Sequence, residues 1–323
     1  MLSASSPFTF LLFGASGHLA QLKIYPALYV LALKKRLPRE YAIVGFARSD
    51  MDDASFRELV KKSIEKDMMN EVNEEVMNSL LDHTFYHQGK YDEEASFTAL
   101  AKRISSLEET WSQKAVRLAY LSIPPSVFGN VLHLLCKADI HNDHPFRCIL
   151  EKPVGHDLKS FTALKKTLLS CFQEEEIYLL DHYLGKEAVR NAYYLRLANP
   201  VLETLLHNTL IEHVEITADE TAGLEGRAGY FNDIGTLRDM VQSHLLEIMA
   251  LLTLPLDEAS IPTARLKAMQ QITLPSAKNL DEVMVQGQYT AGTNGGKRMI
   301  AYHEEKDVPK TSRTNTFIAL KLH

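Results

Sequence analysis

The sequence predicts an α/β protein: an N-terminal Rossmann-type, doubly wound parallel sheet, followed by an α+β domain with a mainly antiparallel sheet. Short apolar segments alternate with helical patterns throughout the first half, which is typical of a parallel sheet covered by helices. A glycine-containing turn connects the first apolar segment to the first helical pattern. In the second half a long helical pattern is followed by strand-like segments, which indicates a different architecture there.

The composition is that of an ordinary globular protein, with 46% hydrophobic and 24% charged residues among 323. This length suffices for two domains, which we place at residues 1–176 and 177–323. The net charge of −6 argues against nucleic acid as a partner, and the first apolar run is too short to span a membrane. The three cysteines have no metal-type spacing, and their odd number and wide separation predict reduced thiols in a cytoplasmic protein.

The first apolar run, Phe8 to Phe13, predicts a buried parallel strand because it is almost continuously hydrophobic. The turn Gly14-Ala15-Ser16-Gly17-His18-Leu19-Ala20 follows directly, and a helical pattern runs from Leu22 to Leu33. Strand, glycine turn and helix are the context of a dinucleotide-binding motif, in which glycines let the backbone approach a pyrophosphate. A glycine turn without any ligand remains the alternative on this motif alone.

The second expected strand, Tyr41 to Phe46, leads to Arg48. At this position an acidic residue binds the ribose hydroxyls of NAD, whereas an arginine suits the 2′-phosphate of NADP. Arg48 therefore indicates NADP, and a solvated surface arginine is the alternative.

The alternation continues to about residue 172. Strands are expected at 84–87, 117–122 and 147–150, and helices at 53–66, 71–81, 95–107 and 157–172. Because doubly wound sheets bind ligands at the carboxyl ends of their strands, Arg48, Ser122 and Lys152 are candidates for a binding site. Pro153 could fix the backbone and orient Lys152; the alternative is a surface lysine before a proline.

The stretch Asp181-His182-Tyr183-Leu184-Gly185-Lys186-Glu187 lies between an expected buried strand at 177–180 and an expected helix at 184–197. Unpaired N–H groups at the start of a helix attract anions. His182 and Lys186 are four residues apart, so in a regular first turn they would share a face and form a cradle for a phosphate. A polar helix start with a capping aspartate is the alternative.

The remaining chain predicts a strand at 211–218, one long helix at 233–254, a helix at 257–273 and strands at 283–289 and 314–322. Asp239 and His244 lie on the long helix, about 140° apart around its axis at the usual pitch. Their spacing alone does not place them in one site. A single histidine on a mostly apolar helix is more often a packed residue than a catalyst.

Taken together, these motifs resemble the glucose-6-phosphate dehydrogenase family from Phe8 to Leu322. The motifs that carry the resemblance are Gly14–Ala20, Gly45–Ser49, Glu151–Pro153, Asp181–Glu187, Glu225–Tyr230, Arg238–Leu245 and Gly287–Tyr289. The resemblance implies oxidation of glucose 6-phosphate to 6-phosphogluconolactone with reduction of NADP, the first step of the pentose phosphate pathway.

The resemblance also implies residue roles. His244 resembles the general base, and Asp181 resembles the carboxylate that orients it. The implied substrate-binding residues are His182, Tyr183, Lys186, Lys152, Glu220 and Asp239. The implied cofactor-binding residues are Gly14, Ser16, Gly17, His18, Leu19, Lys23, Arg48, Ser122 and Lys152. No metal ligand is implied.

The chain departs from the family pattern in two ways. His18 stands where the pattern has aspartate, and Gln21-Leu22 stand where it has basic residues, which bears on cofactor affinity and on the choice between NADP and NAD. Family members are also longer, so we expect an incomplete substrate domain and a homodimer or a partner chain that supplies the missing region. The alternatives are a remnant or regulatory protein that keeps the fold, and an oxidoreductase of another sugar phosphate.

Overall fold

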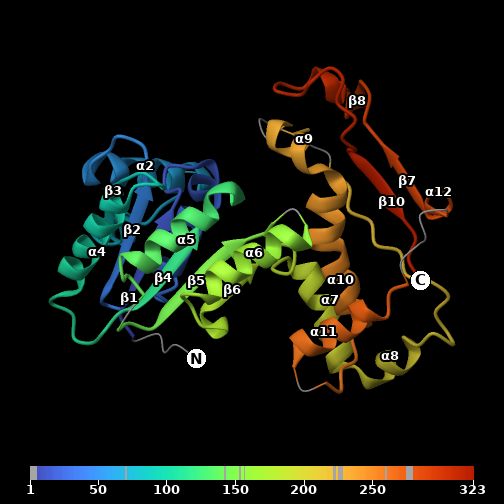
Figure 1. Ribbon diagram of the computed structural model, residues 1–323, viewed down its shortest axis with the longest axis horizontal. Coiled ribbons are helices and arrows are strands. Elements are labelled where there is room, and N and C mark those ends of the chain that lie inside the picture. Colours follow the sequence, from blue (N-terminus) through green and yellow to red (C-terminus); the bar gives the residue numbers. More distant parts are fainter. Residues whose placement is uncertain are drawn as a thin grey trace. The chain divides into compact units, whose positions relative to one another are not determined.

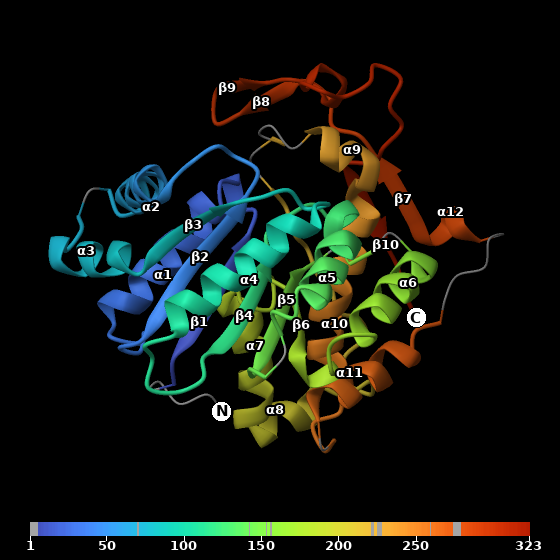
Figure 2. The same ribbon diagram turned by 60° about the vertical axis from the view of Figure 1, so that its left-hand side comes forward.

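The computed structural model describes residues 6–69, 71–141, 143–152, 154–155, 157–220, 223–224, 228–258, 260–273 and 279–323 (Figures 1 and 2). The chain forms two compact units, Met1–Leu180 and Asp181–His323. The division therefore falls after Leu180 rather than after residue 176. No helix among the described residues is both long and apolar enough to cross a membrane.

The first unit is a six-stranded parallel sheet in the order β3-β2-β1-β4-β5-β6 (Figure 1). Its strands are β1 (Phe8–Phe13), β2 (Tyr41–Ala47), β3 (Thr84–Gln88), β4 (Val116–Leu121), β5 (Phe146–Glu151) and β6 (Ile177–Leu180). The order reverses between β1 and β4, and a doubly wound sheet binds ligands beyond the carboxyl ends of the strands at such a point. This confirms the predicted Rossmann-type sheet.

Helices cover both faces of this sheet (Figure 2). They are η1 (Ala20–Ile24), α1 (Tyr25–Leu33), α2 (Asp53–Asp67), α3 (Glu74–Asp82), α4 (Glu94–Glu108), η2 (Pro125–Val127), α5 (Phe128–Lys137), α6 (Leu158–Leu169) and η3 (Glu174–Glu176). Along β1, Phe10 and Leu12 pack with α1, α2 and α3, whereas Leu11 and Phe13 pack with α4, α5 and α6. Successive side chains of a strand point to opposite faces, so a continuously apolar strand fills two cores.

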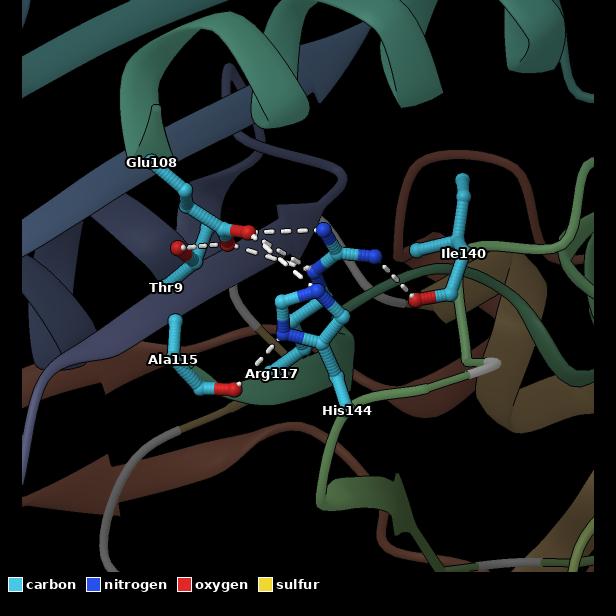
Figure 3. Close-up of polar contacts among 6 residues, drawn as sticks. All are labelled: Thr9, Glu108, Ala115, Arg117, Ile140 and His144. Carbon is cyan, nitrogen blue, oxygen red and sulfur yellow. Dashed lines mark hydrogen bonds and ion pairs between the residues drawn. The ribbon is translucent and has the colours of Figure 1, made fainter. Parts of the chain in front are cut away.

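A buried ion pair, Arg117 with Glu108, lies at the amino end of this sheet (Figure 3). The Arg117 Nη2 lies 2.6 Å from Glu108 Oε2, and both side chains are 7% exposed. Arg117 also donates to the carbonyl of Ile140 at 2.8 Å, and Thr9 donates to Glu108 Oε1 at 2.5 Å. These bonds satisfy charges that would otherwise be costly to bury, and they tie the end of α4 to β1 and β4.

Two of the three cysteines are paired, so the prediction of three reduced thiols is wrong. Cys136 at the end of α5 and Cys171 after α6 form a disulfide, with 6.0 Å between their Cα atoms. They are 35 residues apart in sequence, and the packing of α5 against α6 brings them together. Cys148 on β5 is buried and free.

The second unit is mainly helical, with a small antiparallel sheet (Figure 1). Its helices are α7 (Glu187–Ala198), α8 (Pro200–Leu205), α9 (Ala228–Thr236), η4 (Leu237–Leu245), α10 (Leu246–Thr253), α11 (Ile261–Gln270), α12 (Leu280–Val283) and η5 (Tyr302–Glu304). Strand β7 (Met284–Gly287) pairs with β10 (Phe317–Leu320), so that Met284 is opposite Leu320, and β8 (Gly292–Asn294) pairs with β9 (Lys297–Met299). The predicted α+β character with an antiparallel sheet is confirmed.

Several expected elements differ from those observed. Residues 211–218 belong to no helix or strand of the described structure, and their side chains are mostly exposed. The β6 segment is a strand, but it is the edge of the first sheet, and Tyr178 and Leu179 are exposed instead of buried. The helix expected at 257–273 is shorter, because α11 starts at Ile261 after the cap that Ser260 provides. The β8–β9 hairpin was not predicted; its turn uses Gly295 and Gly296 at positive φ.

Candidate active site

The central feature of the second unit is a hydrogen bond between His244 on η4 and Asp181. The distance from His244 Nδ1 to Asp181 Oδ1 is 2.9 Å, and the side chains are 6% and 2% exposed. Asp181 Oδ1 also accepts a bond from the backbone N–H of Tyr183 at 2.9 Å, which fixes the carboxylate. With its Nδ1–H donated to Asp181, the neutral imidazole keeps Nε2 as an acceptor.

The helix that carries His244 is not the regular α-helix that the sequence predicts. It breaks at Gly235, where φ is 72°, and continues as the π-helix η4. A π-helix has i→i+5 hydrogen bonds, so residues five apart lie about one turn from each other. This winding brings Asp239 and His244 to one side: the charges of both act on the pKa of His182. The expected separation of about 140° therefore does not apply.

His182 lies against His244, with 4.6 Å between their ring centroids and the planes 70° apart. Burial lowers the pKa of His182, and the charges of His244 and Lys186 lower it further, whereas Asp181 and Asp239 oppose the shift. The neutral form of His182 is consequently favoured over a wider range of pH than in a free histidine, although part of its ring is exposed to solvent.

Tyr183 stacks on His244, with ring centroids 4.3 Å apart and an angle of 19° between the planes. Its hydroxyl donates to Glu220 Oε1 at 3.4 Å, and the Nζ of Lys186 lies 3.6 Å from the centre of its ring. Burial raises the pKa of Tyr183, and the charge of Glu220 raises it further. The tyrosine is therefore a hydroxyl donor beside the two histidines.

The turn from His182 to Gly185 is not helical, so the expected shared helix face of His182 and Lys186 is wrong. The amides of Gly185 and Lys186 donate back to the carbonyls of His182 and Tyr183 at 3.2 and 3.0 Å. Lys186 is the N-cap residue of α7, which begins at Glu187. The cluster nevertheless forms, because the turn folds Lys186 over Tyr183 instead of placing it one helical turn from His182.

Seven of the residues predicted for the substrate site are thus linked by contacts or charge interactions in the second unit. They are Asp181, His182, Tyr183, Lys186, Glu220, Asp239 and His244. Asp181, His182 and His244 also offer donor atoms within 4.8 Å of one another, a set that is able to hold a metal ion. A carboxylate bonded to an imidazole Nδ1 is also the arrangement of a histidine general base, and we interpret the pair in that way.

Sequence reasoning missed Arg265 on α11, which belongs to no recognised motif. Arg265 forms an ion pair with Glu247 on α10, one helical turn after His244. Burial lowers the pKa of Arg265, and the charge of Asp181 opposes this shift, so the guanidinium and the Asp181 carboxylate interact. A charged residue on a following helix could not be placed near Asp181 without the packing of α10 and α11.

The glycine turn of the first unit has the geometry of a dinucleotide site. Gly14 has a φ of 84°, and a Cβ built on it would lie 2.1 Å from the carbonyl oxygen of Ser122. Only glycine fits there, because any side chain would separate the end of β1 from the end of β4. Ser16 Oγ lies 2.8 Å from Ser49 Oγ, which joins the turn to the segment after β2.

The other predicted cofactor residues lie on or beside this turn. Gly17 and Leu19 belong to it, His18 is exposed at its end, and Lys23 is on η1. The guanidinium carbon of Arg48 lies 5.9 Å from the ring centre of Tyr91, a residue that sequence reasoning missed. Burial raises the pKa of Tyr91, whereas the Arg48 charge and the backbone of Gly14 oppose this shift. An arginine over an aromatic ring beside the glycine turn fits a phosphorylated dinucleotide.

Lys152 follows β5 directly, and its backbone N–H donates to the carbonyl of Leu180 at 3.3 Å. The preceding Glu151 accepts a hydrogen bond from Tyr120 on β4, and burial raises its pKa. Pro153 and the motif residues Glu225 and Arg227 lie outside the described residues.

Two family descriptions match nearly the whole chain. "Glucose-6-phosphate dehydrogenase, NAD binding domain" matches residues 11–191, and "Glucose-6-phosphate dehydrogenase, C-terminal domain" matches residues 193–323. The glucose-6-phosphate 1-dehydrogenase of Chlamydia pneumoniae is 34% identical over 325 residues, which cover 98% of this chain and 63% of the relative. A chloroplastic glucose-6-phosphate 1-dehydrogenase 3 of Arabidopsis thaliana is 38% identical, with 96% of this chain and 51% of the relative covered.

Solved structures agree with these matches. A glucose-6-phosphate dehydrogenase in complex with its substrate glucose-6-phosphate is similar with a TM-score of 0.87 and 33% identity, and covers 100% of this chain. The chain spans 66% of that protein, and 63% and 51% of the two curated relatives. From the match of both halves, the fold and the sequence identities, the chain belongs to the glucose-6-phosphate dehydrogenase family.

Proposed function

We propose that this chain oxidises glucose 6-phosphate to 6-phosphoglucono-1,5-lactone with hydride transfer to NADP. The observation that carries the proposal is the buried Asp181–His244 hydrogen bond, which leaves one imidazole nitrogen available as a base. The similarity to a glucose-6-phosphate dehydrogenase bound to its substrate supports the choice of sugar phosphate.

The chemistry requires a base at the anomeric hydroxyl. His244 Nε2 takes the proton of the anomeric hydroxyl while a hydride leaves the anomeric carbon for NADP. The C–O single bond at this carbon becomes the carbonyl of the lactone. Bound NADP supplies the hydride acceptor. Asp181 holds the ring in the tautomer that accepts at Nε2 and stabilises the imidazolium as it forms.

The surrounding residues suit the rest of the sugar phosphate. We assign the phosphate to Lys186 and His182, together with Tyr183, whose hydroxyl would have to turn from Glu220 to donate to it. Glu220 and Asp239 are carboxylates near the same cluster and are suited to accept hydrogen bonds from sugar hydroxyls. Lys152, at the end of β5, is the additional cation that we assign to both the sugar and the cofactor.

For NADP we assign the pyrophosphate to the turn at Gly14, Ser16 and Gly17, with His18, Leu19, Lys23 and Ser122 around it, and the 2′-phosphate to Arg48. The backbone fits close approach of a phosphate because no Cβ is tolerated at Gly14. His18 stands in this turn where the family pattern has an acid, so we expect the affinity for the cofactor to differ from that of a chain with the acid.

Partners and location are also proposals. The two-stranded β7–β10 sheet exposes Val285 and Phe317, which supports packing against a second copy of the chain or against another protein. We propose a cytoplasmic location from the resemblance to the family; the cysteines do not support it, because Cys136 and Cys171 are paired.

The test is NADPH formation from glucose 6-phosphate and NADP by the purified chain, with His244→Asn as the key variant. His207→Asn is the matched control, because His207 is exposed and the hydrogen bonds that the described structure gives its side chain are to nearby Thr209. Activity that His244→Asn abolishes and His207→Asn retains would support the proposal. A folded, NADP-binding chain without activity would favour a remnant or regulatory protein, and activity only on other compounds of a sugar-phosphate panel would favour a related oxidoreductase.

A further inference from the structure

The helix that carries Asp239 and His244 begins at a break that another segment of the chain holds in place. Gly235, near the end of α9, has a φ of 72° and a ψ of 163°, which kinks the helix there, and η4 begins after the N-cap residue Thr236. The first N–H groups of a helix have no partner within the helix, so the direction of its start depends on what accepts from them.

Asn315 supplies that acceptor. The backbone N–H of Thr236 donates to Asn315 Oδ1 at 2.8 Å and, at the longer distance of 3.2 Å, to the Asn315 carbonyl. The Thr236 hydroxyl donates to the same carbonyl at 3.0 Å. Asn315 therefore caps η4 from a segment that lies 79 residues later in the sequence. A cap from so distant a segment fixes the helix relative to another part of the fold.

The Asn315 amide is itself oriented. Its Nδ2 donates to Gln286 Oε1 on β7, which leaves Oδ1 directed at Thr236. A Cβ on Gly235 would lie 3.1 Å from Asn315 Oδ1 and 3.3 Å from Thr314 Cγ2, so the break is closely packed against this segment. The Asn315 amide thus bonds at both of its polar atoms: Nδ2 to Gln286 on β7, and Oδ1 to Thr236 at the start of η4.

The neighbouring residues hold the other side of the break. Ser312 Oγ donates to Asn232 Oδ1 at 2.5 Å, and Thr314 Oγ1 donates to the Asn232 carbonyl at 2.6 Å. Tyr302 OH also donates to Asn232 Oδ1 at 3.1 Å. These bonds reach Asn232, before the kink at Gly235, whereas the Asn315 bonds reach Thr236, after it, so the two sides are separable by mutation.

We propose that Asn315 is a positioning residue, which fixes the start of η4 against β7 and thereby sets where Asp239 and His244 stand relative to Asp181 and His182. The inference rests on the proposed function for its catalytic consequence. A shift at Thr236 moves Asp239 within the next turn and His244 two turns on, while Asp181 is held by the turn before α7. A base misplaced by about 1 Å is enough to cost orders of magnitude in rate.

The test compares Asn315→Ala with Asn315→Asp and Ser312→Ala. Asn315→Ala removes Oδ1 and leaves the Thr236 N–H only the more distant Asn315 carbonyl, at 3.2 Å. We expect kcat to fall about tenfold or more and KM for glucose 6-phosphate to rise, with KM for NADP unchanged. Asn315→Asp keeps an acceptor for the Thr236 N–H, which a helix start tolerates well, and should restore kcat to within about twofold of the wild type. Ser312→Ala should lower the melting temperature without lowering kcat.

A second readout does not depend on turnover. In proton NMR the Nδ1–H of His244, held against Asp181, gives a downfield signal that we expect to shift or broaden in Asn315→Ala and to return in Asn315→Asp. Unchanged kcat and an unchanged signal in Asn315→Ala, with only a lower melting temperature, would overturn the proposal. If the chain is inactive, the NMR result still decides on positioning, so the two proposals fail separately.

Should Asn315→Ala not fold, Gln286→Ala replaces it. This variant leaves Asn315 in place but frees its amide, and we expect the same changes in kcat and in the NMR signal at smaller size. A Gln286→Ala protein with wild-type kcat and signal would also overturn the proposal.

Discussion

At the scale of single residues, the Asp181–His244 pair places a charged carboxylate in a buried position. The carboxylate is almost completely buried, which is costly for a charge, yet it accepts two hydrogen bonds, from His244 Nδ1 and the Tyr183 N–H. These bonds compensate for lost hydration and fix the carboxylate. Because the Asp181 carboxylate is held in place, it determines which nitrogen of His244 carries the proton.

This geometry makes Asp181→Asn a selective test of the tautomer. An amide in place of the carboxylate can donate to His244 Nδ1, which would leave the proton on Nε2 and remove the base. We expect kcat for glucose 6-phosphate oxidation to fall about 10³-fold or more, with the fold retained. Asp257→Asn, at an exposed aspartate after α10, is the control and should be unaffected. Equal activity of Asp181→Asn and wild type would exclude the orienting role.

His182 leads to a prediction about stability and pH. Its pKa is lowered in the folded protein, mainly by burial, so protonation is more costly in the native than in the unfolded state. The second unit should therefore keep its full stability above the unfolded pKa of about 6.5 and lose part of it as the pH falls below that value. His182→Gln should remove this part of the loss. Denaturation midpoints at pH 8 and pH 5.5 test it; an identical pH dependence in both proteins would contradict the argument.

At the scale of elements, sequence patterns predicted the first unit well, for a physical reason. Strands buried on both faces are almost continuously apolar, and the glycine turn is required sterically where β1 meets β4. The second unit was harder to predict from the sequence, because its candidate site depends on a π-helix and on a non-helical turn, which have no simple sequence pattern. The alternation of polar and apolar residues at 211–218 resembled a strand, but no described strand pairs with it. The disulfide could not be predicted because it depends on how α5 packs on α6.

The same reasoning separates what could be predicted of the site. The residues Asp181, His182, Lys186 and His244 were found through motifs that resemble a family, and the structure brings them together. Tyr91, Arg265 and Asn315 carry no motif of their own. Each acts through a neighbour far away in sequence, and such partners become visible only with the tertiary structure.

The turn after β1 gives a prediction with a built-in control. Gly14→Ala places a methyl group 2.1 Å from the Ser122 carbonyl at a φ that disfavours L-residues, so we expect a loss of about 2–4 kcal/mol in stability and weaker binding of NADP. Gly129→Ala in α5 meets no atom within 4 Å and should be neutral or slightly stabilising. Denaturant unfolding and calorimetric titration with NADP measure both effects. Unimpaired NADP binding by a folded Gly14→Ala protein would argue against a phosphate at this turn.

At the scale of the whole molecule, the two units are stabilised by different interactions. The first has two apolar cores on a six-stranded sheet, a buried ion pair and a disulfide. In the second unit the clusters of buried apolar residues are much smaller, and Leu195, Val201 and Leu210 are exposed. Free energy from burial scales with the apolar area removed from water, so we expect the second unit to be the less stable of the two.

The single tryptophan of the chain makes this difference measurable. Trp111 packs against the core of the first unit, so its fluorescence should follow the unfolding of that unit, whereas circular dichroism follows both. Saturating NADP, at about 100 times its Kd, should raise the stability of the first unit by about 2.7 kcal/mol and shift the fluorescence transition. Glucose 6-phosphate should mainly shift the earlier part of the dichroism transition and shift the fluorescence transition less, because only Lys152 among its assigned residues belongs to the first unit. If either ligand shifted both signals equally, the two units would unfold as one cooperative body, and the separate stabilities argued here would be wrong.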